Sequence, residues 1–161
     1  MHVTVEYMIL IPMLILQIFL FPIVATTVMN HWTDSRKTLA LQEIAGNLGS
    51  SIQQVYYSLN HESMETGSVN VKVDAPVSIE GSSYRANATL RNLESGDAST
   101  RILDVTVNLM GTQISANTSV TLGQNVEWAD TSTLMSARNS SISAIKAWDG
   151  EQYVIQLGFG A

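Results

Sequence analysis

The sequence predicts an α+β protein in which a long N-terminal hydrophobic helix precedes a C-terminal antiparallel β-sheet or β-sandwich head. Residues 7–29 carry no formal charge, and the apolar pattern that follows, up to about residue 60, repeats every three or four positions. From about residue 67 the apolar pattern repeats every second position, which is typical of strands with one buried face.

The first element is an apolar run that is long enough to cross a membrane. It covers 23 residues, from Tyr7 to Met29, and about 20 suffice for a helix to span the hydrocarbon core. The run lacks the basic start and the small-residue cleavage site of a secretory signal peptide. The nearest basic residues, Arg36 and Lys37, follow the run, although Lys and Arg normally flank the cytoplasmic end of a span. A basic leader removed from in front of Met1 would reconcile these charges with an external C-terminal part.

One acidic residue borders this apolar region, and two prolines interrupt it. Glu6 stands beside it, where an isolated carboxylate is costly. Glu6 lies either in the headgroup zone or next to a positive charge in an assembled state, such as the α-amino group of a neighbouring subunit. Both positions agree with the preference of acidic side chains for a helix N-terminus. Pro12 and Pro22 each remove a backbone donor, so we expect both to kink the helix.

An amphipathic helical segment follows the apolar run and ends near residue 60. Its apolar positions form one stripe, and Gln, Asn and Glu cover the opposite face. Gly46 and Gly49 weaken the helix locally and let another backbone approach closely. The stripe consists of Leu41, Ile44, Leu48, Ile52, Val55 and Leu59.

The head is predicted to contain six or seven short strands separated by turns. An Asp149–Gly150 pair between two alternating segments predicts a hairpin with a two-residue loop. One face of the amphipathic segment can then be buried against a face of the sheet. The residues expected to alternate with polar positions along the strands are Val69, Val71, Val73, Tyr84, Ala86, Ala88, Leu90, Val105, Val107, Leu109, Ile114, Ala116, Thr118, Val120 and Leu122.

The chain therefore divides into a helical stem and a globular head. The stem covers residues 1–60, of which 1–30 are apolar on all sides and 31–60 are amphipathic. The β-rich head covers residues 61–161 and is long enough to form a core of its own.

Neither composition nor motifs point to an enzyme. The 161 residues carry a net charge of −6 and include no cysteine, so we expect no nucleic-acid partner, no disulfide and no thiolate metal site. His2, His31 and His61 lack metal-ligand spacing, and no phosphate-binding loop is present, so we expect no metal and no cofactor. Trp128 and Trp148 are expected to anchor a core or an interface rather than to form a ligand platform.

Three sequons for N-glycosylation occur, and all of them lie in the predicted head. They are Asn87-Ala-Thr, Asn117-Thr-Ser and Asn139-Ser-Ser. A chain this rich in Asn, Ser and Thr produces about two by chance. The three asparagines are therefore candidate modification sites that an external surface would display.

The segment "HVTVEYMIL" resembles the N-terminal signature of archaeal type IV-like pilins with a class III signal sequence. Thr4, Glu6 and Leu10 align with the Ser, Glu and Leu of that signature, and His2 stands where Gln is usual. "VEYMILIP" also resembles the TadE-like pseudopilins, in which V-E-[FY] precedes an apolar run and a proline. Both groups belong to the wider type IV pilin class, and the resemblance covers about 30 residues.

The resemblance implies a subunit that leaves the membrane to form an extracellular cell-surface filament. A prepilin peptidase would remove a leader, and an assembly ATPase and a membrane platform protein would extract the subunit from the cytoplasmic membrane. The apolar helices would pack with copies of themselves, and Glu6 would register the incoming subunit. The residues expected to pack in the filament core are Tyr7, Leu10, Leu14, Ile18 and Phe21.

Three readings of the function stay open at this stage. The first is a structural pilin for adhesion or cell contact, and the second is a minor pilin or pseudopilin that primes or tips a filament. The third is a single-pass membrane protein with an extracellular β-sandwich binding head.

Overall fold

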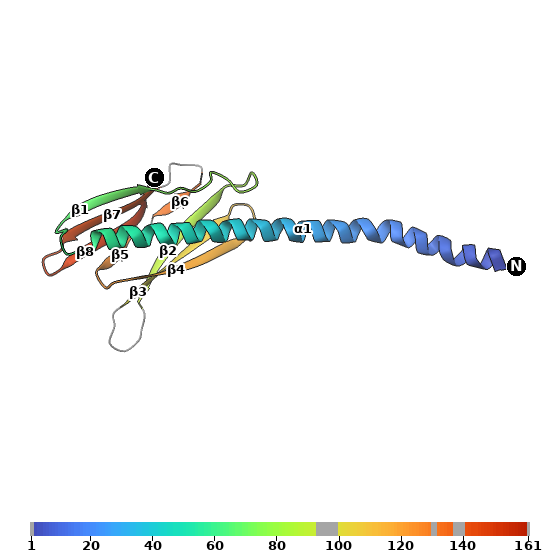
Figure 1. The fold of residues 1–161 in the computed structure, drawn as a ribbon, viewed down its shortest axis with the longest axis horizontal. Helices are drawn as coiled ribbons and strands as arrows, with labels where there is room; N and C mark the ends of the chain where they lie inside the picture. The colour runs from blue at the N-terminus through green and yellow to red at the C-terminus, as the bar shows by residue number, and fades with distance from the viewer. Residues whose placement is uncertain (1, 93–99, 130–131, 137–140, 161) are drawn as a thin grey trace. The chain divides into compact units, whose positions relative to one another are not determined.

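The computed structural model describes residues 2–92, 100–129, 132–136 and 141–160, with side chains from Tyr7 onward. It contains one long N-terminal helix followed by a β-rich region, which confirms the predicted α+β class (Figure 1). Contacts within the chain group the residues into two compact units, Met1–Arg36 and Lys37–Ala161. The elements are α1 (His2–Leu59), β1 (Gly67–Lys72), β2 (Tyr84–Asn92), β3 (Arg101–Leu109), β4 (Ser115–Leu122), β5 (Val126–Trp128), β6 (Thr133–Met135), β7 (Ser141–Trp148) and β8 (Tyr153–Gly160).

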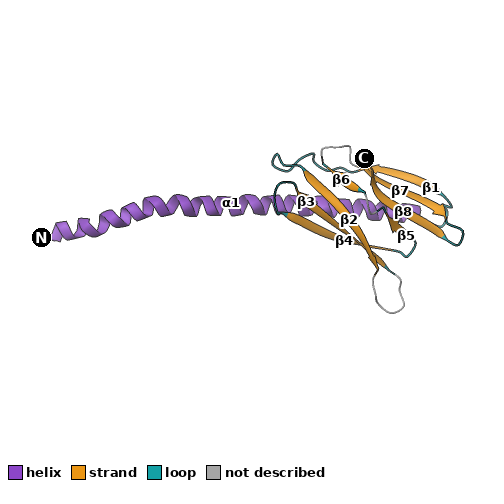
Figure 2. Cartoon of the chain, turned by 180° about the vertical axis from the view of Figure 1, so that it is seen from behind, coloured by secondary structure: helices purple, strands orange, loops and turns teal. Residues whose placement is uncertain are grey.

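The strands of the second unit form two four-stranded sheets (Figure 2). The strand orders are β1-β7-β8-β5 and β4-β3-β2-β6. All described pairs are antiparallel except β5 with β8, which run parallel. The inward faces of both sheets share one hydrophobic core with residues 41–59 of α1. The division of the chain by contacts therefore places this part of the helix with the strands.

The amphipathic stripe is buried as predicted. Leu41, Leu48, Ile52 and Leu59 have no solvent exposure, and the other two stripe residues are also buried. Removing such a side chain from water stabilises the fold by about 1.5–3 kcal/mol. Gly49 lies where the helix approaches β4, because a Cβ atom on it would lie 3.1 Å from the methyl groups of Thr118 and Val120.

The alternation along the strands is also confirmed, although Val73 and Ile114 lie just outside β1 and β4. Ala86 on β2 pairs with Val107 on β3, and Val107 pairs with Ala116 on β4, so one row of buried side chains crosses the sheet. The short strands β5 and β6 were not anticipated, since three residues are too few to show a period.

The hairpin between β7 and β8 is present, but the predicted two-residue loop is wrong. The loop has four residues, Asp149–Gln152, and is closed by the Asp149 N–H, which donates to the carbonyl of Gln152 at 3.1 Å. The Asp149 carboxylate accepts from the N–H groups of Glu151 and Gln152 at 2.9 Å each. The hydrogen bonds from Gln152 and Glu151 hold the pKa of Asp149 below its usual value. These bonds favour the longer loop, and Gly150 adopts the positive φ of 109° that the turn requires.

A lysine is buried where the helix joins the first strand. Lys146 on β7 is 6% exposed, and its Nζ donates to the carbonyls of Met64 at 2.6 Å and His61 at 3.3 Å. The same Nζ lies 5.3 Å from the centre of the Tyr153 ring. Because a buried ammonium group needs partners, these contacts clamp the connection between α1 and β1 against the sheet.

A tyrosine on the helix is fitted to the turn after β4 in a similar way. The N–H of Gly123 donates to the Tyr56 hydroxyl at 3.1 Å, and a Cβ atom at position 123 would lie 2.3 Å from that hydroxyl. A larger residue at this position would have to displace the Tyr56 hydroxyl. Burial raises the pKa of Tyr56 above its ordinary value.

Candidate functional site: the exposed apolar stem

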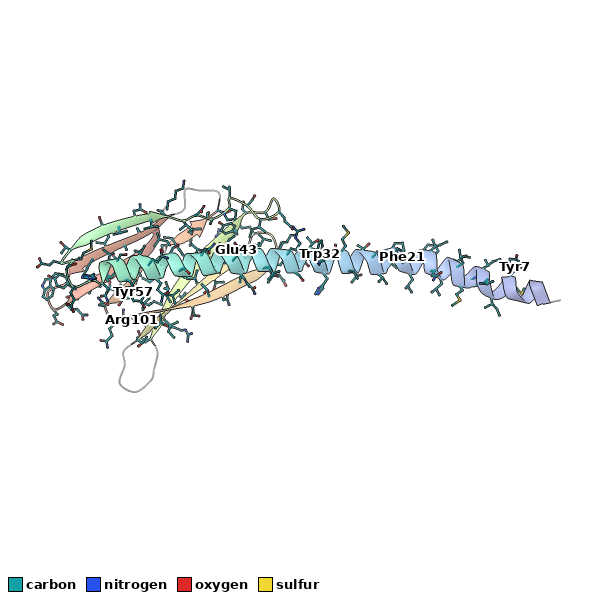
Figure 3. The ribbon with its side chains drawn as sticks, viewed as in Figure 1. Tyr7, Phe21, Trp32, Glu43, Tyr57 and Arg101 are labelled. Carbon is teal, nitrogen blue, oxygen red and sulfur yellow. The ribbon has the colours of Figure 1, made fainter. Side chains whose placement is uncertain are left out.

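The first unit presents apolar side chains on every side of the helix. All side chains from Tyr7 to Trp32 are exposed, and those of Tyr7, Phe21 and Trp32 project from the helix in Figure 3. The most apolar window of the helix has a mean hydropathy of 2.6, and none of it is buried within the chain. By length and composition this helix can cross a membrane. A continuous exposed apolar surface of this kind marks a site of interaction with protein or lipid.

The residues that the sequence assigned to filament packing lie along one face of the stem. Tyr7, Leu10, Leu14, Ile18 and Phe21 are between 52% and 74% exposed. At 3.6 residues per turn their spacing keeps them on one side of the helix. The structure places them on a common face but leaves their packing role untested.

The opposite face of the stem is equally apolar, and sequence reasoning did not single it out. A shallow apolar hollow runs along it. It is lined by Pro12, Ile15, Leu16, Phe19, Leu20, Ile23 and Val24. The helix continues through both Pro12 and Pro22, each of which lacks the donor for one helical hydrogen bond. The signal that would have found this face is the all-round apolar character of the run, since no polar face opposes the first stripe.

The hydroxyl groups near the end of the stem are satisfied within the helix itself. Thr26, Thr27, Thr33 and Ser35 each donate to the carbonyl four residues earlier, at 2.7–2.9 Å. Back-bonding of this kind removes unpaired donors, which are costly away from water. The helix can therefore carry these polar residues into an apolar environment.

An aromatic residue and a cation lie at the C-terminal end of the apolar part of the stem. Trp32 is 65% exposed, and the guanidinium group of Arg36 lies 5.4 Å from the centre of its ring. The next basic residue, Lys37, instead lies 4.0 Å from the carboxylate of Glu80, within the second unit. Two adjacent bases thus have different surroundings.

The other residues predicted as sites are Glu6 and the asparagines of the three sequons. Glu6 belongs to α1, but its side chain lies outside the described residues, so its registering role stays a prediction. Asn87 on β2 and Asn117 on β4 are exposed, and both pair across the sheet with Thr106 on β3. These two sequon asparagines therefore share one cross-strand row on the outer face of the sheet. Asn139 lies outside the described residues.

The two tryptophans of the head differ in their surroundings. Trp128 is 7% exposed and packs edge-to-face on Phe159 with ring centres 5.0 Å apart, as expected for a core anchor. Trp148 is 54% exposed and packs edge-to-face on Tyr153 at 4.9 Å. It lines a shallow hollow of about 200 Å³ on the outer face of the β1-β7-β8-β5 sheet, together with Ile145.

The outer face of the other sheet carries a polar network. The carboxylate of Asp104 accepts hydrogen bonds from Arg91 and Ser119. These two bonds, that of Arg91 first, lower the pKa of Asp104. Among the described residues no three His, Cys, Asp or Glu side chains lie close enough together to hold a metal ion.

No protein-family model, curated protein or solved structure matches this chain.

Proposed function

We propose that this chain is a pilin, the structural subunit of an extracellular type IV-like pilus, which polymerises through its apolar N-terminal helix for surface adhesion or cell contact. The observation that carries this proposal is the apolar part of the stem, from Tyr7 to Trp32, which is exposed on every side. The described residues of the first unit leave this surface uncovered within that unit.

The distribution of the apolar side chains favours many neighbours over a single partner. A two-helix contact buries one stripe, such as the Tyr7–Phe21 face, and leaves the hollow between Pro12 and Val24 open to water. A helical polymer surrounds each helix with several copies, because heterologous contacts that do not close continue indefinitely. Each fully buried Leu, Ile or Phe side chain then contributes about 1.5–3 kcal/mol.

Before assembly the same surface would be covered by lipid. The resemblance at residues 2–10 supplies the other partners, namely a prepilin peptidase, an assembly ATPase and a membrane platform protein. In this proposal the subunit is not an enzyme, needs no cofactor and moves from the cytoplasmic membrane to the cell surface. The polar outer face with Asn87 and Asn117 would meet solvent and is the place for attached sugars.

Filament composition tests the proposal directly. Filaments sheared from native cells are expected to consist mainly of this chain, with a mature start at Met1 or His2 by N-terminal sequencing and any excess mass due to glycans. If the chain stays in the membrane fraction and dissolves in detergent as a monomer, the polymer proposal fails. A low abundance in filaments that another subunit dominates would assign the chain to the minor pilins.

Substitution of Glu6 tests the registering role. Glu6→Leu subunits are expected to form few or no filaments while the head folds normally, because the incoming subunit loses its charged partner. Glu43→Leu is the matched control, since Glu43 is an exposed acid on the same helix (Figure 3). Filament yield is measured by electron microscopy and by the pelleted fraction. Normal yield from Glu6→Leu would refute the role of Glu6.

A single-pass membrane protein with a binding head is the second candidate, and the hollow beside Trp148 is the observation that favours it. Half-exposed aromatic and aliphatic side chains, Trp148 and Ile145, line this hollow together with Glu127 and Asp149. Such a surface is suited to a small ligand or a partner protein. Monomeric extraction together with saturable ligand binding at Trp148 would favour this candidate over the pilin.

A further inference from the structure

We propose that Trp32 and Arg36 form an interfacial anchor that fixes how deeply the stem sits in a phospholipid bilayer. The Trp32 ring occupies the boundary between acyl chains and headgroups, and the Arg36 guanidinium group contacts the lipid phosphates. The inference rests on one part of the proposed function, namely that the subunit lies in a membrane before assembly. It does not require polymerisation.

The spacing of the aromatic residues along the stem matches the thickness of a bilayer. Tyr7 and Trp32 are 60% and 65% exposed, and residues 8–31 between them include no Trp, no Tyr and no formal charge. Twenty-five steps of 1.5 Å separate the two aromatic residues by about 37 Å. A hydrocarbon core of about 30 Å lies inside interfacial zones that bring the total to about 40–45 Å. Tyr7 and Trp32 therefore reach the two interfaces, where Tyr and Trp are enriched.

The pair at the end of the stem combines the two groups that an interface selects. Trp32 and Arg36 are one helical turn apart, and the guanidinium group lies over the ring at 5.4 Å. The ring provides a flat apolar surface and an indole N–H, and the guanidinium fork matches phosphate oxygens. Stacking holds the guanidinium group on the same side of the helix as the ring, so both enter the interface together.

The polar side chains before this pair have different partners from those after it. On the N-terminal side, the hydroxyls of Thr26 and Thr27 are bonded to helix carbonyls and tolerate the apolar zone. On the C-terminal side, Lys37 belongs to the second unit and lies 4.0 Å from Glu80. The lipid-facing surface therefore ends at Arg36, and Lys37 does not contribute to it.

Quenching by brominated lipid tests the position of Trp32. The full chain is reconstituted in phosphatidylcholine vesicles that carry bromine either near the headgroup end of the acyl chains or near the bilayer centre. We expect the shallow bromines to quench Trp32 more than the deep ones. The lipid-quenchable emission should disappear in Trp32→Phe. It should persist in Trp148→Phe, which removes the exposed tryptophan of the head and keeps Trp32. Stronger quenching by the deep bromines, or no loss in Trp32→Phe, would overturn the proposal.

A neighbouring pair of charge substitutions tests Arg36. Arg36→Gln should move the quenching profile of Trp32 toward the deep bromines by about one helical turn, or about 5 Å. Lys37→Gln makes the same change in charge one residue further on and should leave the profile unchanged. Equal profiles for Arg36→Gln and the unsubstituted chain would show that Arg36 does not set the depth. The vesicle measurement reads the unassembled subunit and filament yield reads assembly, so failure of one proposal is distinguishable from failure of the other.

Discussion

Two parts of the same helix meet opposite surroundings. Between Tyr7 and Trp32, α1 is apolar on all sides and exposed throughout, whereas between Leu41 and Leu59 it is apolar on one stripe and buried there. Both parts are α-helical throughout, although Pro12 and Pro22 in the first part each lack one backbone donor, so helix formation does not distinguish them. The distribution of apolar side chains around the axis determines whether a helix covers its own domain or needs other molecules.

The largest expected effect is the difference in stability between two leucine-to-alanine variants, one in each part of the helix. Leu48→Ala leaves a cavity in the core and should lower the free energy of unfolding of the head by about 2–5 kcal/mol. Leu14→Ala should leave it unchanged, because Leu14 is 57% exposed within its own unit. Denaturant unfolding of the full chain in mild detergent, followed by near-ultraviolet circular dichroism, measures both. Comparable losses would mean that the two parts do not differ as described.

The sequence predicts the fold wherever a side-chain period is long enough to be read. The stripe from Leu41 to Leu59 spans five helical turns, and the alternation along β3 spans nine residues, so both could be assigned. The strands β5 and β6 have three residues each, and the parallel pairing of β5 with β8 depends on the tertiary arrangement. Those features become evident only in three dimensions.

The candidate site was predictable in part for the same reason. The apolar run identified the stem, but attention to one stripe, Tyr7 to Phe21, missed the opposite hollow between Pro12 and Val24. Lys146 was also missed, although it has the same parity along β7 as the buried Ile142 and Ala144. The signal in the sequence was a lysine at a position where the two-residue period of the strand predicts a buried side chain.

The next effect in size concerns this buried charge. Lys146→Met keeps the length of the side chain but leaves the carbonyls of His61 and Met64 without their donor. It should cost about 1–3 kcal/mol of unfolding free energy. Lys72→Met is the control, because Lys72 is exposed on β1 and the charge change is the same. Thermal unfolding of both variants measures the difference, and an equal small loss would show that the clamp contributes nothing.

Two glycines sharpen the comparison within the buried part of the helix. Gly46 is exposed with no atom within 4 Å of an added Cβ, so Gly46→Ala should raise the unfolding free energy by about 1 kcal/mol. Gly49→Ala should gain less or destabilise, because its Cβ would lie 3.1 Å from Thr118 and Val120. Equal gains in chemical denaturation would mean that the helix does not approach β4 so closely.

The smallest expected effect is a dependence on pH confined to the head. Arg91 and Ser119 lower the pKa of Asp104 below its ordinary value of 3.8. The resulting stabilisation is therefore present above pH 3.8 and is lost as the pH falls through the lower folded-state pKa. Since Asp104 is partly exposed, the loss should be about 0.2–1 kcal/mol. Asp104→Asn should remove this part of the acid sensitivity in unfolding curves, and an unchanged pH profile would contradict the assignment.

The clamp at Lys146 also bears on how the surface of this protein can change in evolution. Its two hydrogen bonds go to main-chain oxygens at positions 61 and 64, so they do not depend on which side chains those positions carry. The side chains from His61 to Glu65 are exposed. Substitutions across this connection would therefore change the exposed surface of the protein while the link between helix and sheet persists. The same tolerance makes the segment a suitable place for an epitope tag.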